Sequence, residues 1–419
     1  MGFQQGLSGL NASSKTLEVI GNNIANANTV GAKTSRAEFA DIYANALGGS
    51  SNVVGIGTTV ASVAQQFSQG NITATDNPLD IAINGGGFFE VKTPAGAVNY
   101  SRNGQFKVDR DGYIVNDQLQ QLMGYPADAS GTIIPGTAVA LKMPTGGITP
   151  AVTTTIGMEM NLDSRLGVTM PSSGAPIDFA DPSTYNNATS QTVYDAKGQS
   201  VALTYYFQKA SADTWNVYVA ANGAPIATAG GNPAASTTIT FPANGTAPTA
   251  PAGTVAIDIP SVTNDAGATS VPITGIALDV SKATEFGSAF GVTDLAQDGY
   301  ASGQLIGVQF ENNGVVTARY SNGQTKPAGQ IELATFRNPQ GLEPLGGNAW
   351  GISYKSGDPI VGTPGSGNLG VLQAGAVEES NVDLTAELVN MITAQRFYQA
   401  NAQTIKTEDQ ILQTIVNLR

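Results

Sequence analysis

The two ends of this 419-residue chain carry the same seven-residue apolar repeat, and this repeat constrains the fold more than any other feature. Near the N-terminus its positions are Phe3, Leu7, Leu10, Leu17 and Ile24. Near the C-terminus they are Leu384, Leu388, Met391, Tyr398, Ile405 and Leu412. Such a spacing places an apolar stripe along one face of a helix. It predicts two long amphipathic helices, within residues 1–30 and 380–419, that pack as a coiled coil or bundle against each other and against adjacent chains.

The alternative is that the two helices only cover a core within one molecule. Ser380-Asn381-Val382-Asp383 fits a capping box, and Glu378 and Glu379 lie where a helix dipole favours anions. The N-terminal helix is weaker, because each of its glycines costs about 1 kcal/mol relative to alanine. These glycines are Gly2, Gly6, Gly9 and Gly21. The asparagine-rich stretch NNIANANTVG (22–31) follows and predicts that the helix ends there.

Between the helices the sequence is typical of β-structure. Residues 81–91 indicate a strand, a glycine turn and another strand, and 100–115 indicate hairpins with turns at Asn103-Gly104 and Asp111-Gly112. Val201, Leu203, Tyr205 and Phe207 alternate along one strand, and Trp215, Val217 and Val219 along the next. Residues 221–256 are rich in alanine, threonine, glycine and proline and indicate exposed loops and edge strands.

We therefore predict a mainly β fold with α-helical termini, an interrupted middle β-domain and an inserted outer β-domain. Residues 1–30 with 380–419 form the axial helices, and 31–70 with 358–379 form flexible connectors. The middle domain takes 71–144 with 284–357, and the outer domain takes 145–283.

Composition excludes several classes of function. The chain has no cysteine and no histidine, which removes disulfides, thiolate chemistry and serine–histidine triads. Its net charge of −13 argues against nucleic acid as a partner. The charges of residues 1–47 and 380–419 sum to 0 and −1, so the ends are nearly neutral and the interior is acidic. The N-terminus has no basic segment followed by an apolar run, so we expect neither a cleaved signal peptide nor membrane insertion.

No motif in the sequence has the residues and spacing that a catalytic, cofactor-binding or metal-binding site requires. Asp109-Arg110-Asp111-Gly112 lacks the later ligands of a calcium loop and indicates a hairpin turn. Gly85-Gly86-Gly87 precedes a strand instead of a helix, and 362–367 lacks the lysine of a phosphate loop. The carboxylate pair Asp76 and Asp80 could in principle serve a glycosidase, but nothing in the sequence indicates that the two converge in a cleft. We expect no catalytic, cofactor-binding or metal-binding residues.

Four blocks in order resemble the bacterial flagellar rod and hook proteins, an axial family. They are NIANANTVGAK (23–33), QG with LDIAINGGGFF (69–89), SRNGQFKVDRDGYIVND (101–117) and the C-terminal block 375–419. The family signature residues are Asn23, Asn26, Asn28, Thr29, Gly31 and Lys33. The blocks cover roughly 1–125 and 300–419. The interior stretches VYDAKGQSVALTYYFQ and GLEPLGGNAWGISYKSGDPIVG resemble the hook proteins within this family.

The resemblance implies a structural subunit that polymerises into the curved hook and acts as a universal joint between motor and filament. It implies a self-polymer, with the distal rod, hook cap, hook–filament junction proteins and flagellar export apparatus as partners, in an extracellular location. Alternatives are a distal rod protein or another axial component and, more remotely, a secreted β-rich glycan-binding protein or enzyme.

Overall fold

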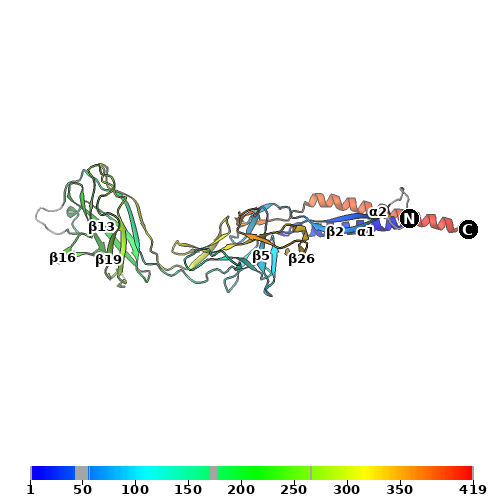
Figure 1. Cartoon of the computed structure of the whole chain (residues 1–419), viewed down its shortest axis with the longest axis horizontal. Helices are drawn as coiled ribbons and strands as arrows, with labels where there is room; N and C mark the ends of the chain where they lie inside the picture. The colour runs from blue at the N-terminus through cyan, green and yellow to red at the C-terminus, as the bar shows by residue number, and fades with distance from the viewer. Residues whose placement is uncertain (1, 43–54, 56, 170–176, 265–266, 418–419) are drawn as a thin grey trace. The chain divides into compact units, whose positions relative to one another are not determined.

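The computed structural model describes residues 2–42, 55, 57–169, 177–264 and 267–417 (Figure 1). The chain is mainly β with one helix at each end, α1 (Gly2–Ala25) and α2 (Leu384–Asn417), which confirms the predicted fold class. It divides into two compact units. Unit 1 comprises 1–145, 306–319 and 325–419, and unit 2 comprises 146–305 and 320–324.

The central part of unit 1 is a 13-stranded sheet whose main path runs β22-β23-β24-β9-β5-β6-β27-β26. Against it packs an aromatic cluster in which Phe88 meets Phe67, Phe336 and Trp350 edge to face. The main-path strands are β5 (Phe88–Lys92), β6 (Val98–Ser101), β9 (Gln121–Pro126), β22 (Leu305–Phe310), β23 (Val315–Tyr320), β24 (Thr325–Ile331), β26 (Glu343–Gly346) and β27 (Ala349–Gly351). The branches are β7 (Lys107–Val108), β8 (Ile114–Val115), β10 (Val139–Ala140), β25 (Leu333–Thr335) and β28 (Ile360–Gly362).

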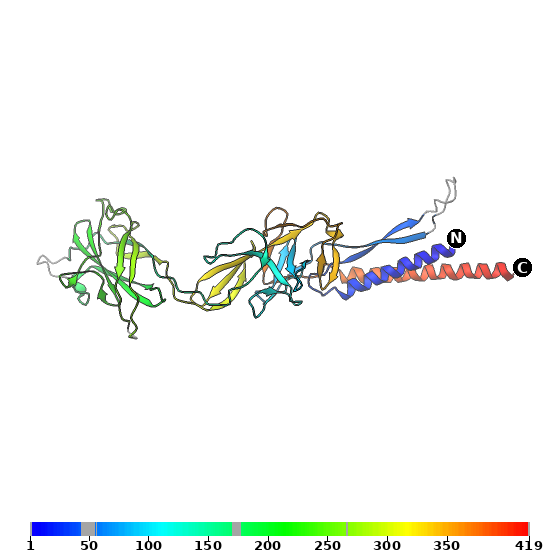
Figure 2. The same cartoon turned by 60° about the horizontal axis from the view of Figure 1, so that its bottom comes forward.

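Two short antiparallel ladders join the N-terminal and C-terminal halves of unit 1. Strand β3 (Ile72–Ala74) pairs with β30 (Ala376–Glu378), and β4 (Ile81–Asn84) pairs with β29 (Val371–Ala374). These ladders place the segment that follows α1 beside the segment that precedes α2. The two terminal helices therefore leave the sheet from neighbouring positions, and Figure 2 shows them side by side.

The expected connector 31–70 contains a regular β-hairpin. Strands β1 (Ser35–Ile42) and β2 (Gly57–Gln65) pair antiparallel over their full length, with a bulge between Glu38 and Phe39. All residues of the two strands are exposed or half-buried, and no third strand joins them among the described residues. The run TTVASV (58–63) is rich in β-branched residues, and this feature of the sequence could have indicated a strand here.

Unit 2 has a core between two main sheets. One sheet is ordered β19-β20-β11-β21 and the other β12-β13-β14-β15, with β18 on β14. The bounds are β11 (Thr155–Asn161), β12 (Asn187–Tyr194), β13 (Ser200–Ser211), β14 (Thr214–Ala221), β15 (Ala224–Pro225), β18 (Thr237–Thr240), β19 (Val255–Ile259), β20 (Ile273–Asp279) and β21 (Gly291–Gln297). A small ribbon adds β16 (Thr228–Ala229) and β17 (Asn232–Pro233). Among the described residues, each unit contains one 3-10 turn, Pro182–Thr184 in unit 2 and Pro339–Gly341 in unit 1.

The alternation predicted for β13 and β14 is confirmed, because Val201, Leu203, Tyr205, Phe207, Trp215, Val217 and Val219 are all buried. The hairpin turn at Asp109–Gly112 is also confirmed, since Asp109 Oδ1 accepts from the backbone of Asp111 and Tyr113. The prediction of a hairpin turn at Asn103-Gly104 is wrong. Here β6 pairs with β5 and β27, and Gly104 lies against the carbonyl of Ile81.

Two further positions differ from the sequence-based prediction. Residues 284–305 belong to unit 2, because β21 pairs with β11, whereas we expected them in the middle domain. Within 221–256, expected to be exposed, Ile239 and Phe241 enter the core of unit 2. Both differences arise because a tertiary strand partner determines burial and the local composition does not show that partner.

Glu90 and Glu332 are two neighbouring carboxyl groups in unit 1 that are removed from solvent and have no basic partner among the described residues. Glu90 lies on β5, and burial raises its pKa to about 7, with a smaller contribution from the negative charge of Glu332. Burial also raises the pKa of Glu332, opposed by a 2.9 Å hydrogen bond from the Tyr125 hydroxyl. Tyr100, opposite Glu90 on β6, is the other titratable neighbour.

We expect unit 1 to lose stability as the pH rises from about 4.5 to about 7. The folded pKa of Glu90 lies above its usual 4.5, so between these values the folded state holds a proton that the unfolded state releases. Stability therefore falls until about pH 7, by on the order of 1 kcal/mol, because partial exposure screens the charge. Urea unfolding followed by the 5-fluorotryptophan resonance of Trp350 measures it, with Trp215 reporting unit 2. An unchanged decline in Glu90→Gln would contradict this origin.

Candidate assembly site

The two terminal helices pack through a row of glycines. Gly2, Gly6 and Gly9 of α1 face α2, where their neighbours are Asn401, Ile405 and Glu408. A Cβ added at Gly6 would lie 3.0 Å from Ile405 Cγ1, and one at Gly9 would lie 2.7 Å from Asn401 Oδ1. The glycines that weaken α1 in isolation therefore permit close approach of the two helices.

The predicted interface residues lie mostly outside this seam. Phe3 and Leu7 are 47% and 44% exposed, and Leu384, Leu388 and Leu412 are exposed on α2. Leu10, Leu17, Ile24, Met391 and Ile405 are half-buried, and Tyr398 is at the border of exposure. Within one chain, the seam thus uses glycines where we expected apolar pairs. The exposed apolar positions form two rows with no partner in the described part of this chain.

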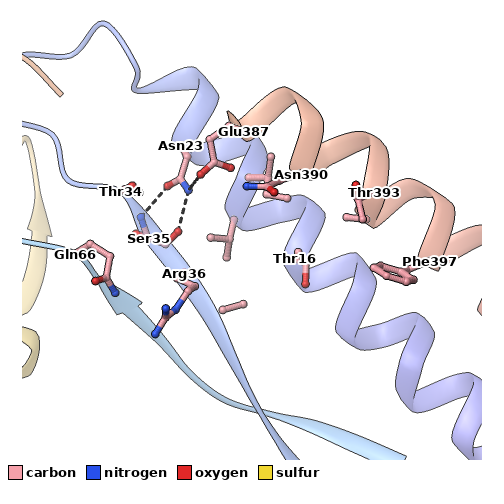
Figure 3. A pocket seen from close by; sticks show the side chains of 14 residues that line it. Thr16, Asn23, Thr34, Ser35, Arg36, Gln66, Glu387, Asn390, Thr393 and Phe397 are labelled. Carbon is pink, nitrogen blue, oxygen red and sulfur yellow. Dashed lines mark hydrogen bonds between the residues drawn. The ribbon is translucent and has the colours of Figure 1, made fainter. Parts of the chain in front are cut away.

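The signature residues form the exit from α1. Asn23 is buried, and its side-chain amide donates to Ser35 O at 2.8 Å and to Glu387 Oε1 of α2 at 3.2 Å, while its oxygen accepts from Ser35 N (Figure 3). Asn26 donates to Asn22 O and accepts from Thr29. Asn28 is exposed. The cluster therefore ends α1 and fixes the start of β1 beside α2.

Gly31 is required by its backbone conformation and by its neighbours. Its φ is +73°, and an added Cβ would lie 2.6 Å from the Asn103 nitrogen. Its own N–H donates to Glu378 O at 2.8 Å. The chain thus turns from the helix onto the sheet of unit 1 at a point where only glycine fits.

Glu378, at the end of β30, joins all four sequence blocks through one buried carboxylate. Its Oε1 accepts from Lys33 Nζ at 2.6 Å and from Gly70 N at 2.9 Å, and its Oε2 accepts from Arg102 Nη1 at 3.0 Å. The three charged side chains are 0 to 4% exposed. This cluster, which we call the Glu378 hub, ties the segments adjoining both helices to the sheet.

The electrostatics of the Glu378 hub are asymmetric, with two cations around one carboxylate. Burial lowers the pKa of Lys33 and of Arg102, and Glu378 opposes both shifts. Lys33 also donates to Ser68 O at 2.8 Å and Arg102 to Gly85 O at 2.9 Å, while Arg102 Nε has no described partner. Loss of the carboxylate would therefore leave two buried cations without a counter-charge, whereas loss of either cation would leave one balanced pair.

The capping box predicted at residues 380–383 is wrong in its details. Asp383 caps α2, because its Oδ1 accepts from Thr385 N and Ala386 N. Asn381 instead donates to Gln66 O and accepts from Thr34 N. Glu378 belongs to the buried hub, six residues before α2 begins. Sequence reasoning missed the roles of Glu378, Arg102 and Gly70, although all three lie in the blocks that carried the resemblance.

A groove lies between α1, α2 and β1, with a volume of about 360 Å³. Its lining residues are Thr16, Val19, Ile20, Asn23, Thr34, Ser35, Arg36, Ala37, Gln66, Glu387, Asn390, Thr393, Ala394 and Phe397 (Figure 3). Across the described ranges, acidic side chains nowhere gather in threes at a potential metal site. Neither described helix has the length and hydropathy needed to span a membrane.

Family comparisons define the class of protein. Residues 3–33 match the family described as flagella basal body rod protein, and 373–418 match the C-terminal family of flagellar basal body rod FlgEFG proteins. Residues 82–159 match the flagellar hook protein FlgE/F/G D1 domain, and 161–300 the flagellar basal body protein FlaE D2 domain. The chain is thus an axial protein of the flagellar rod and hook class.

Within this class, the chain belongs to the flagellar hook protein family. It is 44% identical to the flagellar hook protein FlgE of Salmonella typhimurium and 41% identical to that of Escherichia coli K12, covering 100% of both chains in each case. The fold resembles the crystal structure of Helicobacter pylori flagellar hook protein FlgE2, with a TM-score of 0.52 at 14% identity, over 72% of this chain and 99% of that one.

Proposed function

We propose that this chain is the structural subunit of the bacterial flagellar hook and polymerises into a curved, flexible tube that passes motor torque to the filament. The observation that carries the proposal is the helix pair. Its seam uses glycines, which leaves the apolar rows of Phe3 and Leu7 and of Leu384, Leu388 and Leu412 outward for neighbouring chains. The near-neutral ends reduce repulsion between stacked copies.

The role is geometric, and no step of catalysis belongs to it. A subunit with different patches on its two sides makes heterologous contacts, which generate an open helical polymer when they do not close into a ring. The proposed partners besides further copies are the distal rod, the hook cap, the hook–filament junction proteins and the flagellar export apparatus. The proposed location is outside the cell.

Electron microscopy of cells and of the purified polymer tests the proposal. Cells lacking the chain should carry basal bodies without hooks, and the complemented strain should regain curved tubes. A straight, rigid shaft would instead support the alternative of a distal rod component, and intact hooks in the deletion strain would contradict the proposal.

Unit 2 should be dispensable for forming the tube. The chain enters and leaves it through adjacent segments, because Ile148 bridges Gly303 and Ala151 bridges Tyr300. Deleting residues 152–299 and joining the ends with an Asn-Gly turn therefore keeps these bridges. We expect tubes of altered curvature and rigidity, measured by electron microscopy and by motility. Loss of all polymer, while unit 1 remains folded by its Trp350 signal, would show that unit 2 is needed for assembly.

A further inference from the structure

The C-terminal end of α2 extends past α1. Gly2, the first residue of α1, faces Glu408, so α2 continues for residues 409–417 with no turn of α1 beside it (Figure 2). We call residues 409–417 the overhang. Its side chains Ile411 and Leu412 are 48% and 54% exposed. At 1.5 Å per residue, the overhang is about 13 Å long, or roughly two and a half turns.

The groove lies near the opposite end of the same helix pair. Its floor includes Val19, Ile20 and Ala394, which are buried, and Phe397 stands at its rim with 61% exposure. Its side along β1 includes Ala37. The volume of about 360 Å³ is large enough to take apolar side chains from one helical turn.

The polar character of the two surfaces also matches. The overhang carries a single charged side chain, Asp409, and the groove lining contains one cation, Arg36, and one anion, Glu387. One carboxylate oxygen of Glu387 is buried without a described hydrogen-bond partner. The overhang supplies a side-chain amide donor at Gln410, while the amide of Gln413 donates to Asp409 Oδ2 at 2.9 Å. The negative end of its helix dipole suits Arg36, which also pairs with Glu38.

We propose that the overhang of one copy docks in the groove of the next, which rests on the proposed polymerisation. The occupant of the groove is thus the last turns of α2 from a second copy. Because the groove and the overhang lie near opposite ends of one helix pair, each chain offers one donor and one acceptor. Such head-to-tail contacts propagate without limit, which is what a tube requires.

Paired cysteines test this contact directly, since the chain contains no native cysteine. Thr16→Cys lies in the groove and Leu412→Cys lies on the overhang. Within one chain Thr16 lies 14 residues, or about 21 Å, from Gly2, and Leu412 lies a further four residues beyond Glu408, which faces Gly2. The two positions are therefore too far apart for a disulfide within one chain. Any disulfide between them therefore joins two chains. Mild oxidation of hooks isolated from cells should give a ladder of covalent multimers on denaturing gels, and a reductant should collapse it to one band.

The single variants are matched controls, because each can form at most covalent dimers. Curved tubes that give no ladder from Thr16→Cys with Leu412→Cys would overturn the docking while leaving the proposed function intact. A ladder from Thr16→Cys with Val63→Cys instead would assign the groove to the β1–β2 hairpin of a neighbour and likewise overturn it. If the native chain forms no tube at all, the proposed function itself fails.

Discussion

Replacing Glu378 by alanine should lower the free energy of unfolding of unit 1 by about 3–5 kcal/mol and abolish assembly. The substitution leaves the Lys33 ammonium and the Arg102 guanidinium buried without a counter-charge, and it leaves Gly70 N without its acceptor. It also frees the segments that adjoin α1 and α2 from their common anchor. Because a typical domain is stable by only 5–15 kcal/mol, this loss is a large part of the total.

Three comparison variants separate the charge from the general effect of mutation. Glu379 is the exposed neighbour in sequence, so Glu379→Ala should change stability by less than about 0.5 kcal/mol. Lys33→Met should cost less than Glu378→Ala, because it leaves Arg102 and Glu378 as a balanced pair. Glu378→Gln keeps the shape and the acceptor for Gly70 but removes the charge, so its loss of stability should lie between those of Lys33→Met and Glu378→Ala.

Urea unfolding of the full chain, followed by the 5-fluorotryptophan resonance of Trp350, measures these losses, and Trp215 reports unit 2 as an internal control. Electron microscopy of cells that produce each variant measures assembly. The interpretation of the hub requires the order Glu378→Ala, then Lys33→Met, then Glu379→Ala. Equal losses for the first two variants would show that the excess of positive charge is not what makes Glu378 critical.

The elements that the sequence predicted well are those with a long, regular pattern. The helix over 384–417 and the alternating strands around Tyr205 and Val217 follow from periodicity, which reports burial directly. The resemblance blocks identified the family, but they did not show which of their residues meet. Lys33 and Glu378 are 345 positions apart, and local sequence carries no sign of a contact at that separation.

The glycines of α1 show most clearly why part of the site was not predictable. Helix propensity treats Gly2, Gly6, Gly9 and Gly21 as equal costs. In the folded chain three of them face α2, while a Cβ at Gly21 would meet nothing within 4 Å. The difference depends on the position of the second helix. It therefore depends on the fold of unit 1, which sets where both helices begin.

This difference gives a prediction in which propensity and packing disagree in sign. Leucine is a better helix former than glycine by nearly 1 kcal/mol, so propensity alone says that Gly6→Leu and Gly21→Leu both stabilise α1. The packing of the two helices predicts that only Gly21→Leu stabilises α1. At Gly6 the new side chain meets Ile405 and the Asn401 carbonyl, which lie 3.0 Å and 3.6 Å from the added Cβ, and it must push the helices apart.

We expect Gly6→Leu to destabilise the helix pair by about 1–3 kcal/mol, despite its better propensity, and to prevent tube formation. Hydrogen exchange of the α1 and α2 amides measures the pairing, and electron microscopy measures the tube. Gly21→Leu serves as the control and should raise the protection of α1. If Gly6→Leu raises protection as much as Gly21→Leu does, the glycine row is not the seam. The inference that Phe3 and Leu7 face outward to bind neighbouring copies, because glycines form the seam, would then fail.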